Sequence, residues 1–419
     1  MPIVVQKYGG TSLADAEKIK RVAKSVMKEV EKGNSVVTVV SAMGHTTDYL
    51  IKMAHELTMT PDSREMDMLL STGEGISIAM LAMALKSMGQ DAISFNAMQV
   101  GIMTEKTHSN ARIVKIHTEK IKKQLEKGRV VVVAGFQGIT EDNEITTLGR
   151  GGSDTSAVAI AGALNAIRCD IYTDVEGVYT TDPRIVPKAE KLEKISYEEI
   201  LELARLGANV LHPRAVETAL QYNVPLRVRS TFKTDDLGTL IIGVNDMEIY
   251  KPVTGVAADT SQVRVVICDV QDKPGTAGKL FSLLADNNLS VDMIIQSYAR
   301  SSNNTNDIAF TIDTGDLAKF ESLKETILEN LTASNIYIDE NIAKVSIVGA
   351  GMIDRPGIAA SMFKTLTNEN INIKMISTSE IKISCLVNKE DAKKAVQALC
   401  KTFELECDTI AEVKGTLPD

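Results

Sequence analysis

The sequence predicts an α/β fold in which a mainly parallel sheet lies between helices and is followed by two small, related domains. Before residue 245, short apolar segments alternate with glycine turns and helical patterns, which is typical of parallel strands joined by crossover helices. Beyond it the chain repeats itself: residues 272–294 and 354–376 are identical at nine of 23 positions, at an offset of 82. A length of 419 residues also favours two or three domains.

Composition and charge exclude several classes of protein. A hydrophobic content of 44% is that of a globular chain, and a net charge of −9 without a basic stripe argues against a nucleic-acid partner. The opening apolar run is too short for a signal peptide and no 18 apolar residues run together, so we expect no membrane span. Five cysteines without a CxxC pair and five histidines without ligand spacing predict a reduced, cytoplasmic protein that lacks a metal site.

The first elements place a glycine turn at a strand end. Residues 3–5 predict a short buried strand, and residues 7–10 (KYGG) turn away from its end. A helix is expected over 15–32 because apolar residues recur there at helical spacing, and a second strand is expected over 36–40. Ligands of parallel sheets gather at the carboxyl ends of the strands, where this turn lies.

The next elements carry further polar candidates. Residues 65–90 are largely helical, and Glu74 stands between two glycines there, either as a ligand-binding group or as a solvated glutamate. Apolar strands are expected over 130–134 and 170–173. The second leads into residues 174–184, which hold an aromatic residue, acids and an arginine, as the binding of a base and phosphates requires; the alternative is a surface hairpin.

The central candidate is the turn Gly149-Arg150-Gly151-Gly152, which runs through Ser153 and Asp154 into an apolar helix over 157–164. Glycines let main-chain amides approach a ligand closely, and a helix start favours an anion. Arg150 adds a planar fork that fits a carboxylate or a phosphate. We therefore expect an anion site; the alternative is a tight strand-to-helix turn with Asp154 as the helix cap.

Four motifs in this order resemble those of the aspartate kinase family: KYGGTS (7–12), RGGSDTSA (150–157), YTDVEGVYTTDPR (172–184) and GANVLHPRA (207–215). The two DxPG repeats resemble tandem ACT domains, small-ligand sensors with a ferredoxin-like βαββαβ topology. The resemblance covers essentially the whole chain. It implies an amino-acid-kinase domain over 1–244, a linker and a strand contributed to the regulatory region over 245–260, and ACT domains over 261–340 and 341–419.

The implied reaction is the ATP-dependent phosphorylation of the β-carboxylate of L-aspartate to 4-phospho-L-aspartate, the first step of lysine, threonine and methionine biosynthesis. A carboxylate with a pKa near ~3.9 is already ionised, so no general base is required. The two anions must instead be aligned and their charge neutralised. By resemblance Lys7 meets the phosphates, Asp154 orients Lys7, and Mg²⁺ accompanies ATP.

The resemblance also assigns the binding residues. Arg150 is expected to hold the α-carboxylate of aspartate and Glu74 its ammonium group. The other substrate-binding candidates are Ser41, Thr47, Phe136 and Ser153. The ATP-binding candidates are Lys7, Tyr8, Gly9, Gly10, Thr173, Asp174, Tyr179, Asp182, Arg184 and Asn209. Many relatives have lysine where this chain has Asn209, so either that lysine is dispensable or Arg214 serves in its place.

Feedback inhibition by lysine, threonine or both is expected at the ACT pair. In each repeat, Pro-Gly precedes a helix whose free amides can receive a carboxylate. The allosteric candidates are Asp272, Gln296, Asn372, Ile373 and Ser379. Open sheet edges of the ACT domains predict a homodimer or a larger assembly, and a second subunit that starts near Met247 is expected to give an α₂β₂ tetramer.

Two other functions stay open. A carboxylate kinase of the same fold acting on glutamate or acetylglutamate is the first, although those families lack the paired DxPG domains. A non-catalytic amino-acid sensor is the second, and the presence of Lys7, Glu74, Arg150 and Asp154 argues against it.

Overall fold

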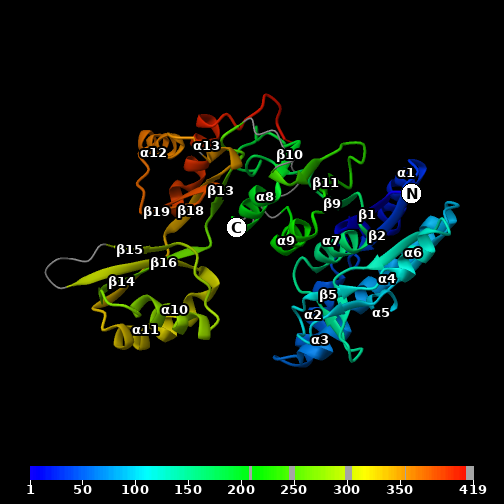
Figure 1. Ribbon diagram of the computed structural model, residues 1–419, viewed down its shortest axis with the longest axis horizontal. Coiled ribbons are helices and arrows are strands. Elements are labelled where there is room, and N and C mark those ends of the chain that lie inside the picture. The colour runs from blue at the N-terminus through cyan, green and yellow to red at the C-terminus, as the bar shows by residue number, and fades with distance from the viewer. Residues whose placement is uncertain (207–209, 245–250, 298–303, 354, 412–419) are drawn as a thin grey trace. The chain divides into compact units, whose positions relative to one another are not determined.

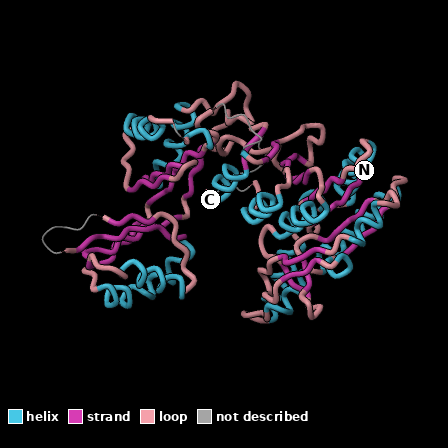
Figure 2. Tube along the Cα trace, viewed as in Figure 1, coloured by secondary structure: helices cyan, strands magenta, loops and turns pink. Residues whose placement is uncertain are grey.

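The computed structural model describes residues 1–206, 210–244, 251–297, 304–353 and 355–411. They group into two compact units (Figures 1 and 2). The first unit takes Met1–Tyr179 and resumes at Glu190, and the second takes Thr180–Ala189 and continues to Ile410. The boundaries predicted from the sequence, at 244, 260 and 340, stay predictions.

The first unit is built on an eight-stranded sheet of order β10-β12-β11-β9-β1-β2-β6-β3. The pairs from β11 to β3 are parallel, and β12 runs antiparallel to β11. This arrangement confirms the mainly parallel α/β fold. The strands are β1 (Ile3–Tyr8), β2 (Ser35–Val40), β3 (Ala92–Phe95), β6 (Val130–Ala134), β9 (Arg168–Thr173), β10 (Lys194–Ser196), β11 (Leu226–Ser230) and β12 (Thr239–Ile242).

Helices cover the sheet because their apolar faces match it. In α1 (Ala16–Glu31), Val22 and Val26 are fully buried, and Leu81 and Leu85 of α4 (Thr72–Ser87) join them in one core. α7 (Gly152–Leu164) packs on β1, β2 and β9 and against α9 (Pro213–Tyr222). The other helices of this unit are α2 (Thr46–Leu57), α3 (Ser63–Leu70), α5 (Ala97–Val100), α6 (Glu119–Leu125) and α8 (Tyr197–Arg205).

Two local features differ from the sequence analysis. α7 begins at Gly152 rather than at 157: the main-chain N–H of Thr155 already donates to Gly151 O at 3.1 Å, and the hydroxyl groups of Thr155 and Ser156 donate to the carbonyl oxygens of Gly151 and Gly152 within the helix. A second, four-stranded sheet was not predicted. Its order is β5-β4-β7-β8, with β4 (Ile102–Thr104), β5 (Ile113–Ile116), β7 (Gln137–Ile139) and β8 (Ile145–Thr147).

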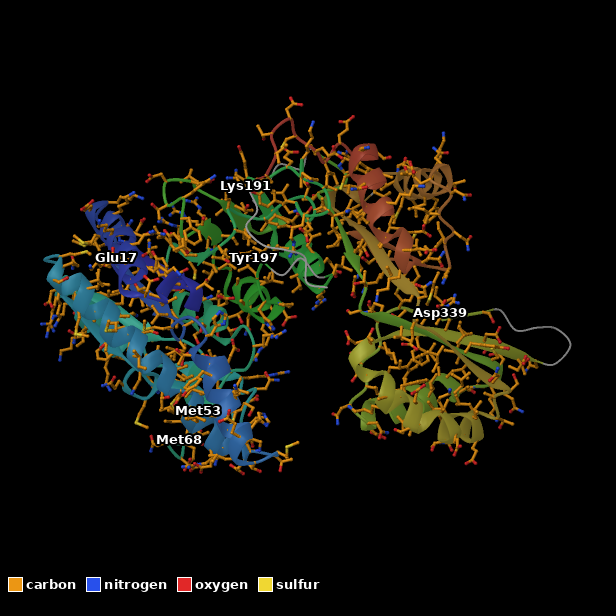
Figure 3. The ribbon with its side chains drawn as sticks, turned by 180° about the vertical axis from the view of Figure 1, so that it is seen from behind. Glu17, Met53, Met68, Lys191, Tyr197 and Asp339 are labelled. Atoms are coloured by element: carbon orange, nitrogen blue, oxygen red, sulfur yellow. The ribbon has the colours of Figure 1, made fainter. Side chains whose placement is uncertain are left out.

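One helical stretch, Ser63–Ser87, is long and apolar enough to cross a membrane by length and composition alone. In the folded chain its second half, α4, packs against α1, β3 and β6. Leu81 and Leu85 are fully buried there, and Glu74 is buried within the same stretch. Of the most apolar 18-residue window of the stretch, 39% is buried. Met68 of α3 is exposed, as is Met53 of α2 (Figure 3).

The second unit holds the two predicted ACT domains, each built on a four-stranded antiparallel sheet, with orders β15-β16-β14-β17 and β13-β18-β20-β19. The first domain follows the βαββαβ pattern. In the second, β13 (Gly255–Asp259), which precedes the first domain, pairs with β18 and takes the fourth strand's place. The other elements are β14 (Gln262–Gln271), α10 (Thr276–Asp286), β15 (Ile294–Gln296), β16 (Thr305–Asp313), α11 (Leu317–Leu331), β17 (Asn335–Asp339), β18 (Ile342–Val348), α12 (Ile358–Asn368), β19 (Met375–Thr378), β20 (Lys382–Asn388) and α13 (Ala392–Thr402).

The repeat seen in the sequence has the same backbone in both copies. Gly275 and Gly357 are the N-cap residues of α10 and α12, with φ of 93° and 99°.

Ion pairs also form within the second unit. Asp339, labelled in Figure 3, lies 2.9 Å from Lys374 Nζ and 3.3 Å from an Arg264 nitrogen.

Residues 180–189 belong to the second unit, although they continue the polar segment that follows β9. Val186 is buried in the core of the second ACT domain. Thr180 Oγ1 donates to Leu405 O at 2.7 Å, and Gln397 Nε2 donates to Ile185 O at 3.0 Å. The predicted nucleotide segment 174–184 is therefore divided between the two units.

Candidate active site

Neighbouring strand ends form one edge of the main sheet. β1, β2, β6 and β9 are parallel neighbours, so the turns that follow them lie side by side. Gly44 N donates to Gly10 O at 2.9 Å, and Gly135 N donates to Val40 O at 3.0 Å. A Cβ at Gly10 would lie 2.6 Å from Ala42 O, so only glycine lets the first and second turns approach this closely.

Lys7 and Asp154 form an ion pair at this edge. Lys7 Nζ lies 2.6 Å from Asp154 Oδ1, and the two side chains are 13% and 14% exposed. Oδ1 makes no aligned hydrogen bond within the described chain, so the attraction of opposite charges holds the pair. Asp154 stands in the first turn of α7, and the N-cap is Gly151. The alternative in which Asp154 caps the helix is therefore wrong.

Glu74 is buried in the first turn of α4, with 2% of its surface exposed. Its Oε1 accepts a hydrogen bond from Ala42 N at 3.1 Å, and its Oε2 has no hydrogen-bond partner among the described residues. Burial raises the pKa of Glu74 to about 7, against the opposing effect of these main-chain hydrogen bonds. The solvated-glutamate alternative is wrong: this is a buried carboxyl with an unpaired oxygen, which suits a cationic ligand.

The glycine turn before α7 presents Arg150 at the surface. The guanidinium of Arg150 forms no hydrogen bond or ion pair with another residue that the structure describes. Gly151 has a φ of +70°, and a Cβ there would lie 2.3 Å from His212 Cβ and Cγ. No other residue type fits this position without moving α9.

Phe136 lies against the same turn in an unusual conformation. Its φ is +66°, which is rare for a bulky side chain and marks stored strain. Two hydrogen bonds hold it: Phe136 N donates to Ser156 Oγ at 3.1 Å, and Leu148 N donates to Phe136 O at 2.8 Å. Phe136 thus joins the β6 end to the turn that carries Arg150.

The other substrate-binding candidates lie on the same edge. Ser41 directly follows β2 and its N–H donates to Tyr8 O at 3.1 Å. Thr47 stands in the first turn of α2, and Ser153 is buried in the first turn of α7. A Cβ at Gly73 would lie 2.8 Å from Ala42 Cβ, so the start of α4 also contacts the turn after β2.

The nucleotide candidates of the first unit follow β1 and β9. Gly9 and Gly10 turn away from β1, and Thr173 Oγ1 donates to Asp174 Oδ1 at 3.0 Å at the end of β9. The side chain of Tyr8 is fully buried and its hydroxyl donates to Ser25 Oγ at 3.0 Å, so only the main chain of Tyr8 is available to a ligand.

The remaining nucleotide candidates fall into three places. Tyr179 is the last residue of the first unit before the chain passes to the second. Asp182 and Arg184 belong to the second unit and form an ion pair at 2.7 Å. Asn209 lies outside the described residues.

Asp67 was missed by the sequence analysis. It lies on α3 with no exposed surface, and its carboxylate accepts from Thr147 Oγ1 at 2.6 Å and from Ser109 N at 3.0 Å. His108 Nδ1 lies 2.8 Å away. These contacts fix β8 two residues before the Arg150 turn. A single acid in the apolar run EMDMLL was the signal in the sequence.

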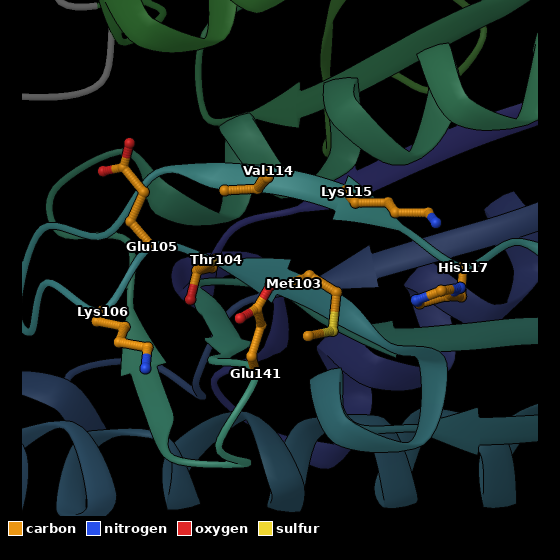
Figure 4. A pocket seen from close by; sticks show the side chains of 8 residues that line it. All are labelled: Met103, Thr104, Glu105, Lys106, Val114, Lys115, His117 and Glu141. Carbon is orange, nitrogen blue, oxygen red and sulfur yellow. The ribbon is translucent and has the colours of Figure 1, made fainter.

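A pocket of about 410 Å³ opens beside the small sheet and is separate from these candidates (Figure 4). Met103, Thr104 and Val114 line it together with charged side chains, among which Glu141 lies beside Met103 (Figure 4). Its lining includes none of the predicted site residues.

Four of the five allosteric candidates lie on the edge strands β15 and β19 or beside them, and Asp272 follows the inner strand β14. Asp272 is exposed just after β14, and Gln296 is the exposed last residue of β15. Asn372 and Ile373 precede β19, and Ser379 follows it, donating its N–H to Lys382 O at 2.8 Å. The copy of Asp272, Asp354, lies outside the described residues, as does Met247.

Within the described parts of the chain, no three His, Cys, Asp or Glu side chains are grouped to hold a metal ion. The acids among the predicted site residues of the first unit are Glu74, Asp154 and Asp174, and Asp154 pairs with Lys7.

Comparison with known proteins agrees with this geometry. Residues 2–230 match the amino acid kinase family, and residues 264–331 and 345–403 each match an ACT domain. Over 405 residues the chain is 51% identical to Aspartokinase 2 of Bacillus subtilis, covering 97% of this chain and 98% of that protein. The structure of E. coli aspartokinase III in complex with aspartate and ADP is similar with a TM-score of 0.79 and 27% identity, covering 96% and 100% of the two chains. Its complex with lysine and aspartate gives a TM-score of 0.76, with 27% identity over 96% and 99%.

Proposed function

The chain belongs to the aspartokinase family and is an aspartate kinase, and we propose that it transfers the γ-phosphoryl group of ATP to the β-carboxylate of L-aspartate, giving 4-phospho-L-aspartate. The observation that carries this is the pairing of two groups at one sheet edge. Glu74 offers a buried, unpaired carboxylate oxygen for an ammonium group, and Lys7 offers a cation for a phosphoryl group. An amino acid and a nucleotide are the ligands that need both.

The chemistry follows from an ionised nucleophile. The β-carboxylate has no proton to give up at neutral pH, so it attacks the γ-phosphorus directly and the γ–β bridging oxygen leaves with ADP. Asp154 is already engaged by Lys7 at 2.6 Å, which supports an orienting role rather than a base. Lys7, held by Asp154, stabilises the charge on the transferring phosphoryl group. Mg²⁺ accompanying ATP would supply further positive charge against the phosphates.

Recognition of aspartate is proposed to use its two α-groups. Arg150 binds the α-carboxylate through its planar fork, and Glu74 binds the ammonium group. The exposed, unpaired Arg150 and the unpaired Glu74 oxygen support this assignment. The pocket is completed by Ser41, Thr47, Phe136 and Ser153.

The nucleotide is proposed to lie along the ends of β1 and β9. Thr173 and Asp174 would hold the ribose, and Tyr179 would contact the adenine. Asp182 and Arg184 would shape the phosphate approach. The phosphates would meet Lys7 and the main chain of Tyr8, Gly9 and Gly10. Asn209 is proposed as a nucleotide-binding residue at the position that is often lysine. Lys7 would supply the positive charge for the phosphates, so a second lysine at position 209 is not required.

The test is hydroxamate formation with ATP and Mg²⁺, offering aspartate, glutamate and acetylglutamate in turn to the purified chain. We expect product with aspartate only. The variant Lys7→Ala tests the role of Lys7 in the same assay. Its control is Lys20→Ala, which removes an exposed lysine of α1 and should keep the wild-type rate. Product from glutamate or acetylglutamate and not from aspartate would contradict the proposal, and so would no product from any of the three.

Feedback inhibition by lysine, threonine or both is proposed at the ACT pair. The same left-handed glycine cap precedes both helices, and neither cap residue makes a side-chain hydrogen bond to its helix, which supports a carboxylate site at these helix starts. Gln296, Asn372, Ile373 and Ser379 lie along the edge strands where a ligand between paired domains would be held. The E. coli relative was crystallised with lysine.

This regulation is tested by assaying the wild type with lysine, threonine and both together at millimolar concentration. Gln296→Ala and Ser379→Ala should relieve the inhibition and leave the uninhibited rate unchanged. A wild-type rate that none of the additions lowers, with no heat of binding, would contradict it.

Three further proposals concern context. The reaction would be the first step of lysine, threonine and methionine biosynthesis, in the cytoplasm. β15 and β19 are edge strands, which supports a homodimer or larger assembly through the ACT domains. A subunit started near Met247 would make it an α₂β₂ tetramer, and mass spectrometry of the natively expressed protein decides this by the presence or absence of that shorter chain.

A further inference from the structure

The motif GANVLHPRA contains one arginine, Arg214, whose role neither the proposed chemistry nor the substrate-binding candidates explain. It stands in the first turn of α9, which packs against α7. Arg214 Nη1 donates to Leu148 O at 2.5 Å and to Asn110 Oδ1 at 2.7 Å, and Nη2 donates to Ala111 O at 2.8 Å. The guanidinium group of Arg214 therefore binds three oxygens of the protein rather than a ligand.

These acceptors surround the turn that carries Arg150. Leu148 begins the turn, and its own N–H donates to Phe136 O at 2.8 Å. Ala111 is tied to the strand that enters the turn, because its N–H donates to Thr147 O at 2.9 Å. Arg214 therefore connects Leu148, at the start of the turn, to the neighbouring residues Asn110 and Ala111 through hydrogen bonds from one guanidinium group.

The N-cap of the same helix contacts the turn from a second direction. His212 Cβ and Cγ lie where a side chain at Gly151 would have to be. His212 Nδ1 accepts from Arg214 N at 3.3 Å, which requires an unprotonated ring nitrogen, and burial together with the nearby Arg214 lowers the pKa of His212. The start of α9 thus fixes the turn at Leu148 and at Gly151, on both sides of Arg150.

We propose that Arg214 is a positioning residue for aspartate recognition: it holds the main chain of residues 148–152 so that Arg150 meets the α-carboxylate. This rests on the proposed function of the site. It also decides between the two alternatives raised by Asn209, because an arginine whose nitrogens are bonded to Leu148 O, Ala111 O and Asn110 Oδ1 does not replace a phosphate-binding lysine.

The test compares Arg214→Gln and Arg214→Lys with Arg112→Gln, an exposed arginine that lines the same cavity of about 390 Å³. Losing hydrogen bonds from a charged donor to two main-chain oxygens and one side-chain oxygen should raise the aspartate KM about tenfold in Arg214→Gln, with the ATP KM within about twofold of wild type. Arg214→Lys keeps the charge but not the fork, so we expect an intermediate rise. Arg112→Gln should match the wild type.

Amide hydrogen exchange of residues 148–152, measured without any substrate, gives an independent readout. Exchange should be faster in Arg214→Gln than in Arg112→Gln. An inactive wild type would contradict the proposed function alone, because the exchange comparison still tests the turn.

Three results overturn the proposal. The first is a raised ATP KM with an unchanged aspartate KM, which would make Arg214 a phosphate ligand. The second is Arg214→Lys behaving as the wild type in both readouts, which would mean that the positive charge at position 214 matters and the hydrogen bonds of the guanidinium group do not. If the Arg214 variants do not fold, Asn110→Ala is measured instead, because it removes one of the three acceptors of Arg214 at an exposed residue. The third refuting result is an aspartate KM of Asn110→Ala equal to that of the wild type.

Discussion

The raised pKa of Glu74 makes aspartate binding dependent on pH in the neutral range. Only the ionised carboxylate pairs with an ammonium group, and burial raises the pKa of Glu74 to about 7. Between pH 6 and pH 8 the ionised fraction rises about tenfold, from roughly one in eleven to ten in eleven, which is about 1.4 kcal/mol of binding free energy. Aspartate affinity should therefore strengthen about tenfold over this interval.

The assay is the dissociation constant of aspartate, measured by calorimetry from pH 6 to pH 8, for the wild type and for Glu74→Gln. The variant keeps the side-chain shape and cannot ionise, so its affinity should be weak and flat in pH apart from the titration of aspartate itself. At pH 7 binding to the wild type should also release close to half a proton, seen as a dependence on the buffer's ionisation enthalpy. Equal pH slopes for wild type and variant would refute the reasoning.

The same group predicts how stability without ligand depends on pH. The folded pKa, about 7, is above the ordinary value of 4.5, so the folded state binds the proton more tightly than the unfolded state. The stability that this group contributes is present below pH 4.5 and is lost as the pH rises through 7, a change of about 3 kcal/mol. Glu74→Gln should remove this part of the pH dependence from the unfolding curve.

Three other changes have defined outcomes. Lys7→Ala should lower turnover by at least about 100-fold with aspartate affinity nearly intact, measured by steady-state kinetics and calorimetry; near-normal turnover of the folded variant would refute the assignment. Gly151→Ala forces a Cβ to within 2.3 Å of His212 at φ +70° and should raise the aspartate KM at least about tenfold. Gly278→Ala, which meets open space in α10, is the control and should be neutral. Asp67→Asn weakens buried hydrogen bonds and should lower the free energy of unfolding by about 1–3 kcal/mol, read from urea curves; an unchanged midpoint contradicts that.

The strands and the edge that carries the site were within reach of sequence analysis because their signals are local. Val36–Val40 and Val130–Val133 are unbroken β-branched runs, and the structure buries both in the centre of the sheet. A turn at the end of a parallel strand then follows from topology alone. Lys7 itself lies within β1, which extends to Tyr8, rather than on the turn that was expected to begin at residue 7.

Other features depend on contacts distant in sequence, which local patterns do not carry. The helix α7 begins five residues before its apolar run, and its small polar residues Ser153, Thr155 and Ser156 are buried where α7 packs on β1, β2 and β9. β13 joins the sheet of the second ACT domain across the whole first domain, and Val186 joins the core of that second domain. Neither the β13–β18 strand pair nor the burial of Val186 can be recognised from hydrophobic periodicity in the neighbouring sequence.

The direction of consecutive side chains along β1 links the fold to the chemistry. Lys7 and Tyr8 point to opposite faces of the sheet, so Lys7 meets Asp154 on α7 while Tyr8 is buried beneath α1. There the Tyr8 ring stacks on Tyr172 at 4.5 Å, and Arg229 Nη1 donates to the Tyr172 hydroxyl at 3.0 Å. Stabilising a phosphoryl transition state requires a cation that does not reorganise during the reaction. The buried stack fixes the strand from one face, and that rigidity lets a flexible lysine act as a fixed charge on the other.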